Sequence, residues 1–220
     1  VTIPHKRAVM PHLDEIEPMA RHVGSVNTIT NEGGRLIGAT TDGPGALRVF
    51  EEAGIDLSDK RVLFLGAGGA VRAVAFAVAE MTKASHITLL GRAPRKVDDL
   101  TEDLCAKTRA SVSAGHMTED LEAAMASHDV IIQGTPVGMF PLTSETCVPK
   151  EMFRPEHVVF DMVYRPYKTR LLKEAEEAGC STIPGIEMLI HQAVLQFERW
   201  TGSEAPVEVM RQAVRAKLKA

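Results

Sequence analysis

The stretch that decides the fold is Val62-Leu63-Phe64-Leu65-Gly66-Ala67-Gly68-Gly69-Ala70. An apolar run without polar alternation is typical of a strand that is buried on both faces of a sheet. A helical pattern follows over residues 70–81. Glycines between a strand and a helix let the backbone turn tightly and approach a pyrophosphate, which then meets the free N–H groups of the helix. In this context the near match to Gly-x-Gly-x-x-Gly/Ala predicts a dinucleotide site rather than a purely structural turn. The residues concerned are Gly66, Ala67, Gly68, Gly69 and Ala70.

Strands and helices alternate downstream of this loop, which predicts an α/β fold with a parallel sheet and right-handed crossovers. From residue 168 onward the pattern is helical, and the apolar residues 188–200 predict a helix that packs between layers. The strands are expected at residues 87–90, 130–133 and 158–160, and the helices at residues 95–107 and 121–125.

Upstream of the loop, residues 26–30 and 35–39 flank the turn-rich tetrad Asn31-Glu32-Gly33-Gly34, so they are expected to form a β-hairpin. Residues 44–53 are expected to form a helix, because Gly54 stands where a helix commonly ends. Val1-Thr2-Ile3-Pro4 reads like the end of a strand, from which we expect that upstream sequence is missing.

The segment after the second predicted strand favours NADP over NAD. An NAD-specific unit of this kind usually carries an acid there to bind the ribose 2′-hydroxyl. This chain instead runs Leu89-Leu90-Gly91-Arg92-Ala93-Pro94-Arg95-Lys96, with no acid before Asp98. Arg92, Arg95 and Lys96 could bind a 2′-phosphate, for which arginine offers a planar pair of donors. The alternative is an ordinary solvated basic loop.

Composition excludes several other classes of protein. The 220 residues suffice for one large domain or two small ones, and the formal net charge of −4 argues against nucleic-acid binding. The sequence has no apolar run of the roughly 20 residues that a membrane helix needs. Three scattered cysteines are typical of a reducing compartment and predict a cytoplasmic location. The cysteines have no metal-ligand spacing and the eight histidines form no His-x-x-x-His pair, which predicts no metal site.

Several further motifs resemble the shikimate/quinate dehydrogenase family, and the resemblance covers nearly the whole chain. They include Thr2-Ile3-Pro4-His5-Lys6, Gly24-Ser25-Val26-Asn27-Thr28, Thr41-Asp42-Gly43, Asp161-Met162-Val163-Tyr164-Arg165-Pro166 and Gly185-Ile186-Glu187-Met188-Leu189-Ile190-His191-Gln192. The chain departs from the family pattern at three places, where the family usually has asparagine: Thr40, Gly91 and Gln133.

The resemblance implies a role for each matching residue. Lys6 and Asp42 would be catalytic. The substrate-binding residues would be Thr2, Asn27, Tyr164 and Gln192. The cofactor would be NADP, bound by the glycine loop together with Arg92, Lys96, Thr135, Met162, Gly185 and Met188.

The resemblance also implies a Rossmann-like NADP-binding domain at residues 44–188. A smaller α/β substrate domain, here incomplete, would comprise residues 1–43 and the C-terminal helices at 189–220. The implied reaction is the NADP-dependent interconversion of 3-dehydroshikimate and shikimate in chorismate and aromatic amino-acid biosynthesis, with a homodimer as a possible assembly. The alternatives are a quinate/shikimate dehydrogenase that uses NAD, and a non-catalytic NADP-binding fragment.

Overall fold

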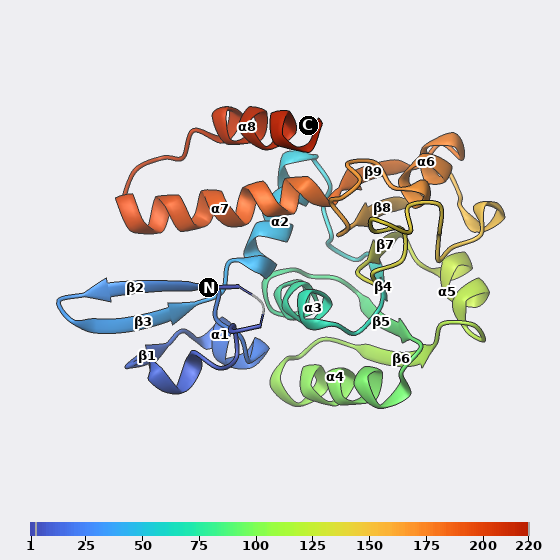
Figure 1. The fold of residues 1–220 in the computed structure, drawn as a ribbon. Helices are drawn as coiled ribbons and strands as arrows, with labels where there is room; N and C mark the ends of the chain where they lie inside the picture. Colours follow the sequence, from blue (N-terminus) through green and yellow to red (C-terminus); the bar gives the residue numbers. More distant parts are fainter. Residues whose placement is uncertain (3, 220) are drawn as a thin grey trace.

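The computed structural model describes residues 1–2 and 4–219, and its centre is a six-stranded sheet (Figure 1). All five strand pairings in this sheet are parallel, as the sequence predicts. The strand order is β6-β5-β4-β7-β8-β9, so successive strands run outward from β4 on one side and from β7 on the other. Such a Rossmann-like order leaves a ligand-binding crevice at the carboxyl ends of the two central strands. The strands are β4 (Arg61–Leu65), β5 (His86–Gly91), β6 (Val112–His116), β7 (Val130–Gln133), β8 (Val158–Asp161) and β9 (Ser181–Pro184).

Both faces of this sheet are covered by helices, as expected of a continuous apolar strand. Val62 and Phe64 belong to the core shared with α3 (Gly69–Met81) and α4 (Pro94–Lys107). Leu63 and Leu65 point to the other face, where α5 (Leu121–Ser127) and α6 (Arg170–Glu177) pack. The alternation follows from the two-residue period of a strand.

A second, three-stranded sheet lies beside the first, and its hairpin projects to the left in Figure 1. The predicted hairpin is confirmed, with its strands at β2 (Thr28–Glu32) and β3 (Arg35–Ala39). The short strand β1 (Glu15–Ile16) adds parallel to β3. The 3-10 helix η1 (Met10–His12) precedes it and α1 (Pro18–Val23) follows it.

The strand expected at the start of the chain is wrong for the residues described there. Val1 and Thr2 lie in no strand, and Pro4 enters a turn in which the His5 N–H donates to the Thr2 carbonyl oxygen. The Val1 nitrogen donates instead to the Asn27 carbonyl oxygen at 2.7 Å. Ile3, which the expectation also included, lies outside the described residues.

Two helices run between the sheets and are held close together by glycines. They are α2 (Asp42–Glu52) and α7 (Gly185–Thr201), both predicted and both slightly longer than expected. A Cβ on Gly43 would lie 2.5 Å from the Ala73 carbonyl oxygen of α3, and one on Gly45 would lie 2.8 Å from the Gln192 nitrogen of α7. The contact with α3 and the contact with α7 therefore both depend on the absence of a side chain. The last helix, α8 (Val207–Lys219), packs on α7.

The expectation that the chain is helical from residue 168 onward is wrong at β9, and the sequence reasoning also missed β6. Both strands lie at the edges of the large sheet, where less of each strand is buried. Edge strands lack the continuous apolar run that identifies a central parallel strand. The division into domains at residues 43/44 and 188/189 stays a prediction. Among helices of the described residues, none is both long and apolar enough to cross a membrane.

Candidate active site

A cleft of about 1190 Å³ opens between the N-terminal segment and the helices α2, α3, α4 and α7. Its walls come from the N-terminal segment, from the start of α2, from the glycine loop after β4, from the segment after β8 and from α7. The sequence-predicted site residues that line it are Thr2, Lys6, Asp42, Ala67, Gly68, Gly69, Ala70, Lys96, Met162, Tyr164, Gly185, Met188 and Gln192.

Lys6 and Asp42 form an ion pair in this cleft, although 36 positions separate them in the chain. The Lys6 Nζ donates to Asp42 Oδ2 at 2.6 Å. Asp42 is the first residue of α2, where the helix dipole favours a negative charge. It is 6% exposed, whereas the lysine side chain is 24% exposed, so the ammonium group is the partner that solvent and ligand reach more readily.

Asn27 holds the other oxygen of the Asp42 carboxylate. Its Nδ2 donates to Asp42 Oδ1 at 2.9 Å and to the hydroxyl oxygen of Thr41 at 3.0 Å. The backbone N–H of Thr41 donates to Asn27 Oδ1, and because that N–H can only donate, it fixes the orientation of the amide. Asn27 is 2% exposed and does not line the cleft, so the structure joins it to Asp42 rather than to the cavity.

The glycine loop joins β4 to α3, and three of its glycines turn the chain or border the cleft. Gly66 has φ +111°, a conformation that side chains disfavour. A Cβ on Gly68 or Gly69 would meet no atom within 4 Å, so both glycines border open space in the cleft. Helix α3 begins at Gly69, and no described side chain caps it. The N–H groups of its first turn are therefore suited to bind an anion such as a dinucleotide phosphate.

Further parts of the wall are formed by α7 and by the segment after β8. Gly185 lies so close to the preceding segment that a Cβ there would be 2.6 Å from the carbonyl oxygens of Asp161 and Met162. Gln192 comes from the third turn of α7 and lies beside Gly45, which brings it near the start of α2. Tyr164 is 47% exposed at the mouth of the cleft.

Some predicted residues do not reach the cleft. The described residues that line it do not include Gly66, Arg92 or Thr135, and Arg92 is exposed on the loop after β5. Sequence reasoning in turn missed Arg72, whose side chain donates to the Val23 carbonyl oxygen at 2.5 Å and pairs with Asp103 at 2.7 Å. Arg72 thereby ties α3 to α1 and α4 along one wall. Its position one turn into α3 is the only sequence signal that it offers.

A buried acid lies behind the wall that follows β8. Asp161 is 0% exposed, and it accepts hydrogen bonds from Thr169 Oγ1 at 2.5 Å, from the Val163 N–H at 3.0 Å and from Gln133 Nε2 at 3.3 Å. Burial raises the pKa of Asp161 to about 6, although its hydrogen bonds act to lower it. Burial likewise raises the pKa of the neighbouring Cys147 thiol to about 12, with the Asp161 charge adding to the effect.

Asp161→Asn is therefore expected to remove a pH dependence of stability. A carboxyl whose pKa is higher in the folded than in the unfolded state adds stability as the pH falls through the folded value. As the pH falls from about 7 to about 5, the free energy of unfolding of the wild type should rise by about 1 kcal/mol relative to that of the variant. Urea unfolding of both proteins at each pH measures this difference. A difference that stays constant, or grows in favour of the variant, would contradict an elevated pKa.

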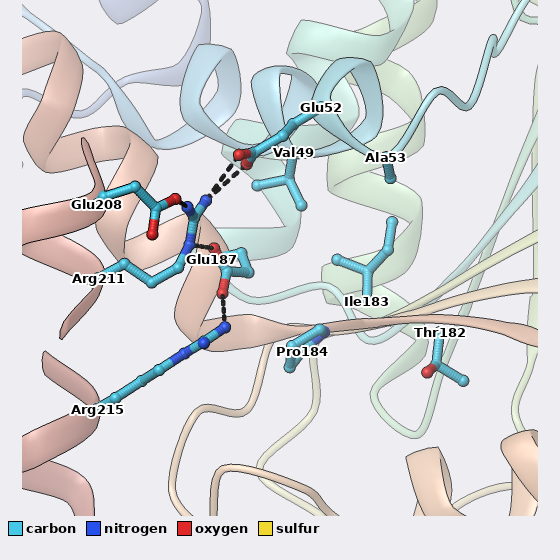
Figure 2. A pocket seen from close by; sticks show the side chains of 10 residues that line it. All are labelled: Val49, Glu52, Ala53, Thr182, Ile183, Pro184, Glu187, Glu208, Arg211 and Arg215. Carbon is cyan, nitrogen blue, oxygen red and sulfur yellow. Dashed lines mark hydrogen bonds and ion pairs between the residues drawn. The ribbon is translucent and has the colours of Figure 1, made fainter.

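A second, smaller cavity of about 400 Å³ lies between α2, β9, α7 and α8 (Figure 2). Arg211, which is 8% exposed, forms hydrogen bonds with the three glutamates that line this cavity. The guanidinium group bonds both oxygens of Glu52 at 2.8 Å, Glu187 at 2.8 Å, and also Glu208. These pairs join α8 to α2 and α7.

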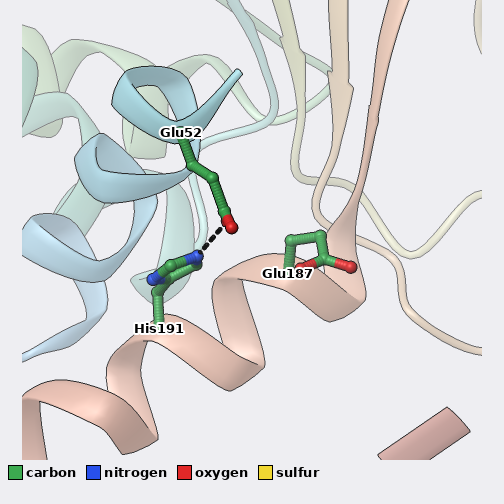
Figure 3. A group of neighbouring side chains, drawn as sticks. All are labelled: Glu52, Glu187 and His191. Carbon is green, nitrogen blue, oxygen red and sulfur yellow. Dashed lines mark hydrogen bonds and ion pairs between the residues drawn. The ribbon is translucent and has the colours of Figure 1, made fainter. Parts of the chain in front are cut away.

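Three of the side chains near this cavity could in principle ligate a metal ion, namely Glu52, Glu187 and His191 (Figure 3). His191 Nε2 is bonded to Glu52 at 2.7 Å, and the Arg211 guanidinium supplies the positive charge between the two carboxylates. The bonds from His191 and Arg211 outweigh burial and hold the pKa of Glu52 below its usual value. The cluster is therefore an ion-pair network that fastens α8.

Family models match the chain over most of its length. The model described as shikimate / quinate 5-dehydrogenase matches residues 46–163. A shikimate dehydrogenase substrate binding domain matches residues 1–29, and a shikimate 5′-dehydrogenase C-terminal domain matches residues 185–215.

Individual relatives agree with the models. A shikimate dehydrogenase (NADP(+)) of Symbiobacterium thermophilum is 46% identical over 222 residues, which is 99% of this chain and 75% of the relative. The crystal structure of shikimate 5-dehydrogenase from Listeria monocytogenes, in complex with shikimate and NAD, has a TM-score of 0.93 at 35% identity and covers 97% of this chain and 76% of its own. The crystal structure of Thermus thermophilus shikimate 5-dehydrogenase, in complex with NADP(H) and shikimate, has a TM-score of 0.85 at 36% identity. The match covers 98% of this chain and 77% of that chain. With its fold, its glycine loop and its cleft matched along the chain, the protein belongs to the shikimate/quinate dehydrogenase family.

Proposed function

We propose that the protein interconverts shikimate and 3-dehydroshikimate with NADP, the reaction of a shikimate dehydrogenase in aromatic amino-acid biosynthesis. The observation that carries this proposal is the Lys6–Asp42 pair, which lines the same cleft as the glycine loop. Such a cleft can hold a dinucleotide and a small polar substrate side by side. The curated relatives with this sequence pattern are shikimate dehydrogenases that use NADP.

The protein residues supply position and proton transfer. NADP would bind with its pyrophosphate on the glycine loop, and it supplies the hydride. Lys6 lines the cleft, where its ammonium form would donate a proton to the carbonyl oxygen during reduction and its neutral amine form would accept one during oxidation. Asp42 fixes the lysine through Oδ2 and is itself fixed by Asn27 through Oδ1. Asn27 thus acts on the substrate through Asp42.

The remaining predicted substrate residues are neutral hydrogen-bonding groups. Thr2, Tyr164 and Gln192 line the cleft from three separate segments. Hydroxyl and amide groups suit the ring hydroxyls of a polyhydroxylated substrate, and they carry no charge that would compete with the Lys6–Asp42 pair.

Steady-state oxidation with two substrates and two cofactors tests the assignment. The purified protein is assayed with shikimate or quinate, each with NADP⁺ or NAD⁺, by the absorbance of the reduced cofactor. We expect the highest kcat/KM for shikimate with NADP⁺. A higher value for quinate with NAD⁺ would assign the site to the other reaction of the family, and binding of NADP⁺ without turnover of either substrate would leave a cofactor-binding protein.

Arg92→Asp is expected to weaken NADP⁺ binding far more than NAD⁺ binding. One charge-assisted pair with a phosphate contributes about 1.5–3 kcal/mol, and the new carboxylate adds repulsion. Isothermal titration of both cofactors measures the change. Arg109→Asp is the matched control, because it makes the same charge change at an exposed position beyond the opposite end of α4. Equal losses for both cofactors would contradict the assignment of Arg92 to the 2′-phosphate.

A further inference from the structure

Each half of the large sheet is expected to bind one of the two nucleotides of a dinucleotide. In this strand order one nucleotide lies over each half, with the pyrophosphate at the central turn. Arg92 follows β5 and Lys96 lies in α4, both in the half that comprises β4, β5 and β6. The nicotinamide half of NADP is thereby left to the segments after β7 and β8, which contain Thr135 and Met162.

Asp161 is connected to both of these segments. Its Oδ1 accepts the N–H of Val163, which fixes the chain between Met162 and Tyr164. The same oxygen accepts from Gln133 Nε2 at the end of β7. Among the described residues, its Oδ2 accepts from Thr169, the capping residue of α6, which does not line the cleft. The two carboxylate oxygens therefore face different parts of the fold.

Gln133 extends the connection along the segment after β7. Its Nε2 also donates to the carbonyl oxygens of Thr135 and Val137, each at 3.2 Å, and its Oε1 accepts from the N–H of Thr135. One side chain thus bonds three backbone groups, the N–H and the carbonyl oxygen of Thr135 and the carbonyl oxygen of Val137. The two N–H groups of Nε2 are shared among the two carbonyl oxygens and Asp161 Oδ1.

The two segments pack closely against each other and against α3 and α7. A Cβ on Gly134 would collide with the Val71 side chain and lie 3.0 Å from Met162 Sδ. A Cβ on Gly185 would lie 2.6 Å from the backbone oxygens of Asp161 and Met162. A change in the bonds of Asp161 is therefore transmitted to the wall of the cleft.

We propose that Asp161 is the positioning residue for the nicotinamide half of the cofactor, acting through Gln133 on residues 135–137 and directly on residues 162–164 without touching the cofactor. The proposal rests on the assignment of NADP to the cleft. The observation that supports it is that Gln133 at the end of β7 and Val163 after β8 both donate to the same buried oxygen, Asp161 Oδ1. Misplacing a reacting group by about 1 Å can cost about 100-fold in rate, so such a residue influences catalysis from outside the cavity.

Four substitutions separate positioning from general stability. Asp161→Leu removes both oxygens, whereas Asp161→Asn keeps an oxygen for Val163 and Gln133 and turns its amide toward the Thr169 hydroxyl. Thr169→Val is the matched control, because it removes the bond to Oδ2 and the cap of α6 but leaves the Oδ1 bonds in place. Gln133→Met is the second test variant should Asp161→Leu fail to fold, since methionine has a similar shape and donates nothing.

The binding probes are NADP⁺ and adenosine 2′,5′-bisphosphate, which carries the adenosine half alone. In Asp161→Leu, or in Gln133→Met, we expect NADP⁺ affinity to fall about 10-fold or more and kcat for shikimate oxidation about 10- to 100-fold. Affinity for the bisphosphate should stay within about 2-fold of wild type. Asp161→Asn should restore both NADP⁺ affinity and kcat, and Thr169→Val should lower Tm while leaving both unchanged.

Equal losses for NADP⁺ and the bisphosphate would overturn the proposal, as would a Thr169→Val variant that loses NADP⁺ affinity in proportion to its Tm. Unchanged affinity and kcat in Asp161→Leu would also overturn it. Failure of the proposed function has a different signature, because the wild-type protein itself would then show no NADP⁺ binding or no shikimate oxidation.

Discussion

Lys6→Ala is expected to lower kcat for shikimate oxidation by about 10²–10⁴-fold, the usual contribution of a positioned acid–base group. Affinity for NADP⁺ should change little, because Lys6 and the glycine loop lie on different elements of the cleft. The reason for the loss is that alanine leaves no group to exchange a proton with the reacting oxygen. Steady-state kinetics and cofactor titration on the same preparation measure both quantities.

His5→Ala is the control for this experiment. His5 is the exposed neighbour of Lys6 and does not line the cleft, so its loss should leave kcat near the wild-type value. A Lys6→Ala protein with near-normal kcat would return Lys6 to the ordinary role of a surface lysine.

Asp42→Asn is expected to lower kcat by about 100-fold or more and to raise KM for shikimate. Both oxygens of Asp42 accept hydrogen bonds from groups that can only donate there, the Lys6 ammonium and the Asn27 amide nitrogen. An asparagine at position 42 must turn its own NH₂ toward one of them, which leaves either Asn27 or Lys6 without its acceptor, and in both cases Lys6 loses the negative charge with which it pairs. Kinetics and thermal unfolding together measure the effect.

The double variant Asn27→Asp/Asp42→Asn tests this explanation. An aspartate at position 27 can still accept from the Thr41 N–H and can now accept from the new amide at position 42. We expect the double variant to regain the Tm that Asp42→Asn loses but to keep a low kcat, because the negative charge no longer touches Lys6. Full kcat in the Asp42→Asn single variant would contradict a requirement for the ion pair.

The central part of the fold was predictable because each of its signals is local. The apolar run at residues 62–65 and the glycines that follow it specify a buried strand, a tight turn and a helix within about 20 residues, and β4 and α3 lie there. Strand β6 contains Ser113 and Gly115 and is only half buried, and β9 has a single buried residue, Ile183. Such edge strands are specified by pairing with the rest of the sheet, which no local pattern records.

Many of the predicted site residues line one cleft, but the bonds among them could not be predicted. The Lys6 and Asp42 motifs could each be matched, and the structure brings the two side chains together. The bond between Asn27 and Asp42 could not be inferred, because it depends on how the hairpin meets α2 across 15 positions. Asp161 likewise belonged to a matched motif, yet its link to Gln133 depends on β7 and β8 being neighbours.

The most direct measurement is the rate of NADPH formation when the protein is mixed with saturating shikimate and NADP⁺. The proton transfer assigned to Lys6 and the cofactor site assigned to the glycine loop predict NADPH formation that requires shikimate and that falls at least about 100-fold in Lys6→Ala. Binding of NADP⁺ without any shikimate-dependent NADPH, or an equal rate in wild type and Lys6→Ala, would contradict the account.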